Sequence, residues 1–156
     1  MSLYTDEKAN TSLTHNIQQQ RPEHLFASRN NPRQIFCISN LSEKIWLYNN
    51  ITHSEFLLIS PLNAGASFGI PWWLSVTQEH KHHSILDCGS SAALAHIALS
   101  EGIGFVVCFA ASKQIRSLQT DHNFRTRILT SRPPSQPISP QTSTCPSSFK
   151  KASSRP

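Results

Sequence analysis

The densest set of metal-binding side chains is the run Glu79-His80-Lys81-His82-His83. Neutral imidazole is a good ligand for zinc, copper and nickel, and a structural or catalytic site needs three or four ligands in fixed geometry. His80, His82 and His83 are therefore the candidate metal ligands, and His80 and His82 would share one side if the run were a strand. A contiguous run is also typical of a solvated connector. The sequence favours the connector, and we predict no cofactor.

A second candidate for chemistry is Ser91, within Gly89-Ser90-Ser91-Ala92-Ala93. A serine in a sharp turn between a strand and a helix is the setting of a hydrolase nucleophile, and the amide of Ala92 would then stabilise the oxyanion. The downstream candidates for the acid and the base are Asp121 and His122. Adjacent residues rarely reach the two positions of one catalytic relay. The sequence therefore favours Ser91 as the N-cap of a helix, with a serine hydrolase as an alternative.

The C-terminal part carries a different kind of signal. Pro134, Pro137 and Pro140 form two overlapping P-x-x-P spacings, which a groove of the SH3 type binds as a polyproline helix. These prolines could bind a protein partner, although the sequence favours an inert Ser/Pro-rich terminus. Residues 113–156 contain eight Lys or Arg against one acid, but little aromatic surface accompanies them. Nucleic-acid binding is therefore not expected.

The element that would position Ser91 is the apolar stretch from Ile85 to Ala111. We predict a strand over 84–88, a helix over 92–101 closed by Gly102, and a strand over 103–110. Both faces of the second strand are apolar, which is typical of a strand that is covered on both sides. The stretch therefore predicts a β-turn-α-β unit.

Short apolar segments precede this unit. Residues 34–38, 44–48 and 55–59 are rich in β-branched and aromatic residues and are separated by polar turns, so we predict three strands in a meander. Residues 70–76 are also apolar, and Pro71 favours a sheet edge or a packed loop. A weak helix is expected within 115–128. The expected fold class is α+β, a small single domain with a short β-meander and a β-turn-α-β unit, flanked by disordered arms.

Composition sets the expected domain boundaries. We predict a disordered N-terminal arm over 1–32, the α+β domain over 33–112, a weakly structured basic segment over 113–129 and a disordered tail over 130–156. The tail has six Pro and eleven Ser or Thr in 27 residues, too few apolar groups to offset the entropy of ordering it. The first ten residues contain neither a basic start nor an apolar run, so no secretory signal is expected and a cytoplasmic location is favoured.

Residues 92–111 are also twenty largely apolar residues followed by Lys113 and Arg116, as in a membrane-spanning helix. Eight apolar side chains would favour insertion by roughly 2.4–4.8 kcal/mol in total, whereas Glu101 near the centre costs roughly 2.5–3.5 kcal/mol. The balance is near zero. We therefore expect Glu101 at a helix end beside Gly102, with a single-pass protein whose basic tail is cytosolic as an alternative.

No complete catalytic set emerges from these patterns. The four cysteines contain no C-x-x-C spacing, which favours reduced, buried thiols. The sequence predicts a small soluble binding or interaction module rather than an enzyme. The alternatives are the single-pass membrane protein, a serine-hydrolase-like or weakly metal-binding protein, and a reading frame with no selected function.

Overall fold

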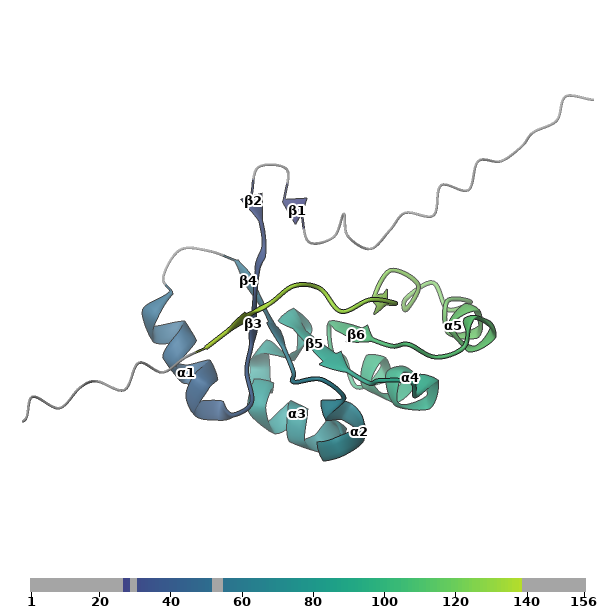
Figure 1. Cartoon of the computed structure of the whole chain (residues 1–156), viewed down its shortest axis with the longest axis horizontal. Coiled ribbons are helices and arrows are strands. Elements are labelled where there is room, and N and C mark those ends of the chain that lie inside the picture. The colour runs from purple at the N-terminus through teal and green to yellow at the C-terminus, as the bar shows by residue number, and fades with distance from the viewer. Residues whose placement is uncertain (1–26, 29–30, 52–54, 139–156) are drawn as a thin grey trace, which may run out of the picture.

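The main feature of the fold is a parallel sheet of six strands (Figure 1). The computed structural model describes residues 27–28, 31–51 and 55–138. The strands are β3 (Gln34–Cys37), β4 (Phe56–Ile59), β5 (Ser84–Asp87), β6 (Phe105–Val107), β7 (Ile128–Leu129) and β8 (Gln136–Pro137), in the order β7-β6-β5-β4-β3-β8 with every pair parallel. A separate antiparallel pair, β1 (Ala27–Ser28) and β2 (Asn31–Pro32), precedes the sheet.

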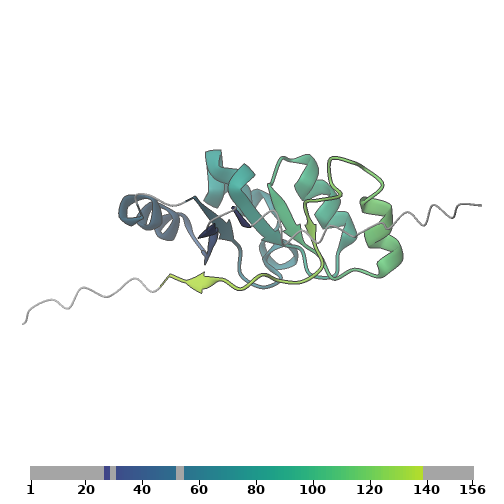
Figure 2. The same ribbon diagram turned by 90° about the horizontal axis from the view of Figure 1, so that it is seen from above.

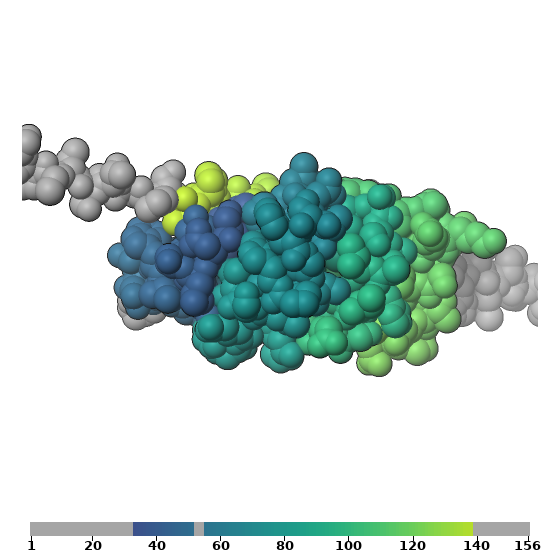
Figure 3. Space-filling view, turned by 90° about the horizontal axis from the view of Figure 1, so that it is seen from below, coloured from purple at the N-terminus to yellow at the C-terminus, as the bar shows by residue number. Residues whose placement is uncertain are grey.

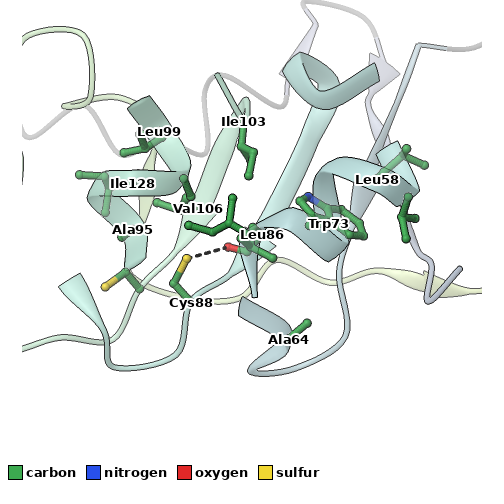
Figure 4. Packing of buried hydrophobic residues seen from close by; sticks show 14 of the residues in the cluster. Leu58, Ala64, Trp73, Leu86, Cys88, Ala95, Leu99, Ile103, Val106 and Ile128 are labelled. Carbon is green, nitrogen blue, oxygen red and sulfur yellow. Dashed lines mark hydrogen bonds between the residues drawn. The ribbon is translucent and has the colours of Figure 1, made fainter. Parts of the chain in front are cut away.

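Helices connect each strand from β3 to β7 with its immediate neighbour. They are α1 (Leu41–Asn50), α2 (Ala64–Phe68), α3 (Ile70–Thr77), the 3-10 helix η2 (Gln78–His83), α4 (Ala92–Ser100) and α5 (Ser112–Leu118). Because these crossovers all step in one direction and crossovers are right-handed, the helices lie on one face of the sheet. Their buried side chains pack there on alternate strand residues, among them Leu58, Leu86, Val106 and Ile128 (Figure 4).

The opposite face of the sheet is also apolar and buried. Its buried residues are Ile35, Leu57, Ile59, Ile85, Val107 and Leu129. After β7, at one edge, residues 130–138 run across the sheet to place β8 at the other edge (Figure 2). We call residues 130–138 the strap. It connects the two edges without a helix.

The α+β class and the β-turn-α-β unit are confirmed. α4 begins after Ser91, whose side chain accepts a hydrogen bond from the amide of Leu94, and ends at Glu101 beside Gly102, where φ is +85°. Residues 92–111 thus divide into α4, a turn and β6, as the expected position of Glu101 requires. No helix in the described part of the chain is long and apolar enough to cross a membrane.

The predicted meander is wrong, because a helix replaces its middle strand and the two remaining strands, β3 and β4, pair in parallel. The apolar segment 70–76, expected at a sheet edge or in a packed loop, is a helix as well. Residues 44–48 lie in α1, which begins where Asn40 accepts the amide of Glu43 at 2.9 Å and the Glu43 carboxylate accepts the amide of Ser39 at 2.6 Å. Reciprocal capping of this kind favours a helix over a strand. Residues 70–76 lie in α3, with Pro71 in the first turn, where the missing amide proton costs no helical hydrogen bond.

The folded region also extends past the predicted boundary at residue 112. α5, β7 and β8 belong to the same sheet and core, and α5 occupies only part of the segment expected to be weakly helical. Residues 130–138 form the strap, where the sequence predicts a disordered tail. Within the expected N-terminal arm, β1 and β2 form an antiparallel pair where the sequence predicts disorder. The other residues of the two expected arms, 1–26, 29–30 and 139–156, fall outside the described residues.

The first test concerns the packing of α3 on the sheet. Trp73 is fully buried, and its indole Nε1 donates a hydrogen bond to Ser84 Oγ at 3.1 Å. We expect Trp73→Ala to lower the free energy of unfolding by about 3–5 kcal/mol, because the cavity adds to the lost burial. Trp72→Ala, at a half-buried neighbour, should cost less than half as much in urea unfolding. Equal losses in the two variants would contradict this packing.

Candidate functional site

A single guanidinium group joins the carboxyl ends of three adjacent strands. Arg132, in the strap, donates from Nη1 to Asp87 Oδ2 at 2.8 Å and from Nη2 to the Ser60 carbonyl oxygen at 2.6 Å. Nη2 also lies 3.7 Å from Cys37 Sγ. Cys37 ends β3, Ser60 follows β4 and Asp87 ends β5. The arginine therefore fixes the strap and three strand ends to one another.

The carboxylate of Asp87 is fully buried, and both of its oxygens accept a hydrogen bond. Its second oxygen, Oδ1, accepts the amide of Gly89 at 3.0 Å, and its own amide donates to Ser60 Oγ at 2.9 Å. A buried charge is tolerated only when a counter-charge and hydrogen bonds compensate its lost hydration. The network around Asp87 supplies both.

The turn at Gly89 is enclosed by the loops on either side of it. Gly89 and Asn63 both have φ of +56°, and a Cβ on Gly89 would collide with Asn63 Oδ1. On the other side, the amide of Phe109 donates to the Gly89 carbonyl at 2.7 Å. The positive φ favours glycine at residue 89. The loops after β4, β5 and β6 are thus in direct contact.

Two large apolar side chains are exposed on these loops. Leu62 is 65% exposed and Phe109 is 48% exposed, and their loops flank the Gly89 turn. Lys113 and Arg116 follow Phe109 on the exposed surface of α5. We call these four residues the carboxyl-edge surface; the buried Gly89 lies in the turn between the loops of Leu62 and Phe109. Figure 3 looks onto this edge, where the dark teal segment that follows β4 lies between the blue and green parts of the chain.

The thiols near this edge are not nucleophiles at neutral pH. Burial raises the pKa of Cys88 to about 12. Burial also raises the pKa of Cys37 above its usual value, although the neighbouring Arg132 acts in the opposite direction. Both cysteines are therefore protonated at neutral pH. Since the thiolate is the reactive form, neither thiol is a good nucleophile there.

Ser91 has the N-cap role that the sequence favours. Its hydroxyl oxygen accepts the amide of Leu94 at 3.2 Å. Asp121 accepts the amide of Asn123 at 2.8 Å within its own turn, and the neighbouring His122 is exposed. In the described structure, no hydrogen bond joins either of these two residues to Ser91.

The three histidines are divided between two places. Residues 78–83 form a 3-10 helix, in which side chains three positions apart share a side. His80 and His83 consequently line one pocket, whereas His82 lies against Gly102, so His80 and His82 do not share a side as they would in a strand. Within the described ranges, no group of three His, Cys, Asp or Glu side chains is placed to hold a metal ion.

His80 is held by a ring contact. Its imidazole stacks on Tyr48 with ring centroids 4.0 Å apart, and its Nδ1 lies 3.0 Å from Glu79 Oε1. Burial lowers the pKa of His80 below its usual value; Lys44 and His83 act in the same direction and Glu79 opposes them. Burial likewise raises the pKa of Tyr48 to about 12. Both rings are therefore uncharged at neutral pH.

Two of the three prolines of the P-x-x-P motif belong to the folded part of the chain. Pro134 lies in the strap, Pro137 pairs with Cys37 in the β3–β8 ladder, and Pro140 falls outside the described residues. A partner that binds this segment as a polyproline helix would first have to separate β8 from β3. A protein partner for these prolines stays a hypothesis.

The Arg132–Asp87 pair is absent from the contacts that the sequence patterns predict. One signal was available, since Asp87 is a lone acid at the end of an otherwise apolar strand and such an acid needs a cation. The sequence does not indicate which cation pairs with Asp87, because 45 residues separate it from Arg132.

No family model, curated protein or solved structure matches this chain.

The second test removes the arginine. Arg132→Met leaves the Asp87 carboxylate buried without a counter-charge, so we expect unfolding free energy to fall by about 3–5 kcal/mol. Adding Asp87→Asn should recover part of that loss. Arg125→Met, at an exposed site, should change stability by less than about 0.5 kcal/mol. A double-mutant cycle from urea unfolding measures the coupling, and additive losses would show that the two groups do not interact.

The third test uses the lowered pKa of His80. Because the unfolded chain binds a proton to this imidazole more readily than the folded chain, stability should fall as pH drops below about 6.5 towards the lower folded pKa. His80→Phe keeps a ring against Tyr48 but cannot be protonated. We expect its melting temperature to fall less steeply than that of the natural chain between pH 7 and pH 5. Parallel curves, with exposed His122→Gln as the control, would exclude this effect.

Proposed function

We propose that this chain is a binding module that holds a segment of a protein partner on its carboxyl-edge surface. The observation that supports this most is the exposure of Leu62 and Phe109 on loops that a buried ion pair fixes in place. Single exposed apolar residues are ordinary, but here two of them flank one turn.

The chemistry of the surface indicates the kind of segment that fits it. Leu62 and Phe109 offer apolar contact, and the exposed Lys113 and Arg116 on α5 offer positive charge. Complementary charge guides association and selects among partners, while a buried apolar contact supplies most of the affinity. The matching partner is an acidic segment with one or two large apolar side chains.

The fixed geometry of the loops favours binding in a second way. A surface that is already ordered loses little conformational freedom when the partner arrives. The hydrogen bonds of Asp87 and Gly89 hold the loops after β4, β5 and β6 before any partner is present. Binding is supported over catalysis because the Ser91 hydroxyl caps α4 and the Cys37 and Cys88 thiols are protonated.

The fourth test is selection of peptides from a displayed random library on the full-length chain. We expect enriched peptides to combine acidic residues with aromatic or aliphatic ones. Their binding should shift the amide resonances of Leu62, Gly89 and Phe109. In Leu62→Ser/Phe109→Ser, affinity should fall at least about tenfold, since truncating central apolar contacts costs more than about 1.4 kcal/mol.

Ile97→Ser is the matched control. Ile97 is 48% exposed, like Phe109, but it lies on α4 away from the loops. Its substitution should leave peptide affinity unchanged, and all variants should keep the thermal transition of the natural chain. A library that yields no specific peptide, or equal losses in both variants, would contradict the proposal.

A further inference from the structure

A pocket of about 220 Å³ lies at the opposite end of the sheet, where the strands begin. Arg33 precedes β3, Phe56 begins β4, and His83 precedes β5. Tyr48 and His80 complete the wall from α1 and η2, and Glu55 lies at the rim. The amino ends of β3 and β4 are at the top of the sheet in Figure 1, on the side away from α2 and the carboxyl-edge surface.

Two polar atoms of this pocket lack partners. Across the described part of the chain, the buried side-chain nitrogens without a hydrogen bond are Arg33 Nε and His80 Nδ1. Arg33 pairs with Glu55 through Nη2 at 2.6 Å, which leaves Nε–H free. His80 Nδ1 lies 3.0 Å from Glu79 Oε1 but is not aligned for a hydrogen bond. A buried unpaired donor is costly, and native structures contain few of them.

The unpaired Arg33 Nε is a donor, because a guanidinium group always carries a proton on this atom. A molecule that pairs with it must therefore offer an acceptor atom. A carbonyl oxygen has two lone pairs, and it suits this need without adding charge.

The walls of the pocket are aromatic. The Tyr48 ring lies 4.0 Å from the His80 ring and 5.0 Å from the Phe56 ring, measured between centroids. Offset ring contacts of this kind are favourable, so a further flat ring can extend the stack. Engineered apolar cavities of about 150 Å³ hold benzene, so the volume here suffices for a single ring with a small substituent.

The charges around the pocket are already balanced. The Arg33 guanidinium is neutralised by Glu55, and the His80 imidazole is uncharged at neutral pH. An anionic ligand would have to compete with Glu55 for Arg33. A neutral ligand can use Arg33 Nε while the ion pair stays intact.

We propose that this pocket binds a small neutral aromatic ring that carries a carbonyl or carboxamide group. The ring stacks beside Tyr48 and His80, and the carbonyl oxygen accepts the Nε–H of Arg33. This site is separate from the carboxyl-edge surface, so failure of one proposal does not affect the other.

The test is a titration of the full-length chain with benzamide, followed by nitrogen-proton correlation spectra that include the arginine Nε–H signals. We expect saturable binding with a dissociation constant in the low millimolar range, as suits a ligand of this size. The Arg33 Nε–H and the amides of Tyr48 and Phe56 should shift. Toluene, which has the ring without the acceptor, should bind at least about tenfold more weakly.

Two variants separate the hydrogen bond from general disruption. Arg33→Met should weaken benzamide binding at least about tenfold, while Arg125→Met should not. Glu55→Gln keeps Nε–H but removes the competing carboxylate, so benzamide should still bind and benzoate should gain affinity. Absence of saturation, unchanged affinity in Arg33→Met, tighter binding of benzoate than of benzamide to the natural chain, or shifts confined to Leu62 and Phe109 would each overturn the proposal.

Discussion

The buried ion pair between Arg132 and Asp87 is the interaction on which the organisation of the carboxyl edge depends. The sheet has helices on one face, and a segment without regular structure connects β7 to β8 across it. None of residues 130–138 is fully buried, so apolar packing alone does not hold the strap. The β3–β8 ladder holds the end of the strap, and Arg132 holds its beginning, because the guanidinium bonds to groups after β4 and at the end of β5 while contacting the end of β3. One side chain thus links the strap to three strand ends.

This arrangement relates the fold to binding. Short parallel strands of two to four residues contribute few ladder hydrogen bonds, so loops at their ends would otherwise be free to open. The Asp87 network and the close contact of Asn63 with Gly89 remove much of that freedom. The same edge exposes Leu62 and Phe109. At the other end of the sheet, Arg33 Nε and His80 Nδ1 are buried without a hydrogen-bond partner, which identifies a second candidate binding site.

The sequence predicts some of this structure and not the rest, for identifiable reasons. The β5-α4-β6 unit was readable because its signals are local: an N-cap serine, a glycine after the helix and an apolar strand. α1 and α3 were misread because their aromatic and β-branched residues favour strands, while the deciding features, Asn40 with Glu43 and Pro71 in a first turn, are capping features. The composition of the strap predicts disorder because it is polar and proline-rich. The strap is ordered by contacts with residues distant in sequence, the Arg132–Asp87 pair and the β3–β8 ladder, which no local pattern contains.

The most direct test of this account is native-state hydrogen exchange at the four amides that follow the strand ends. Ile38 donates to Ile59, Ser60 to Ile85, Cys88 to Val107 and Cys108 to Leu129, each through backbone atoms 2.9–3.0 Å apart. If the Arg132 network holds the carboxyl edge closed, these amides exchange only through global unfolding, with the same free energy as the amide of Leu86 in the core. Fast exchange of the four while Leu86 stays protected would show that the edge opens on its own and would contradict the account.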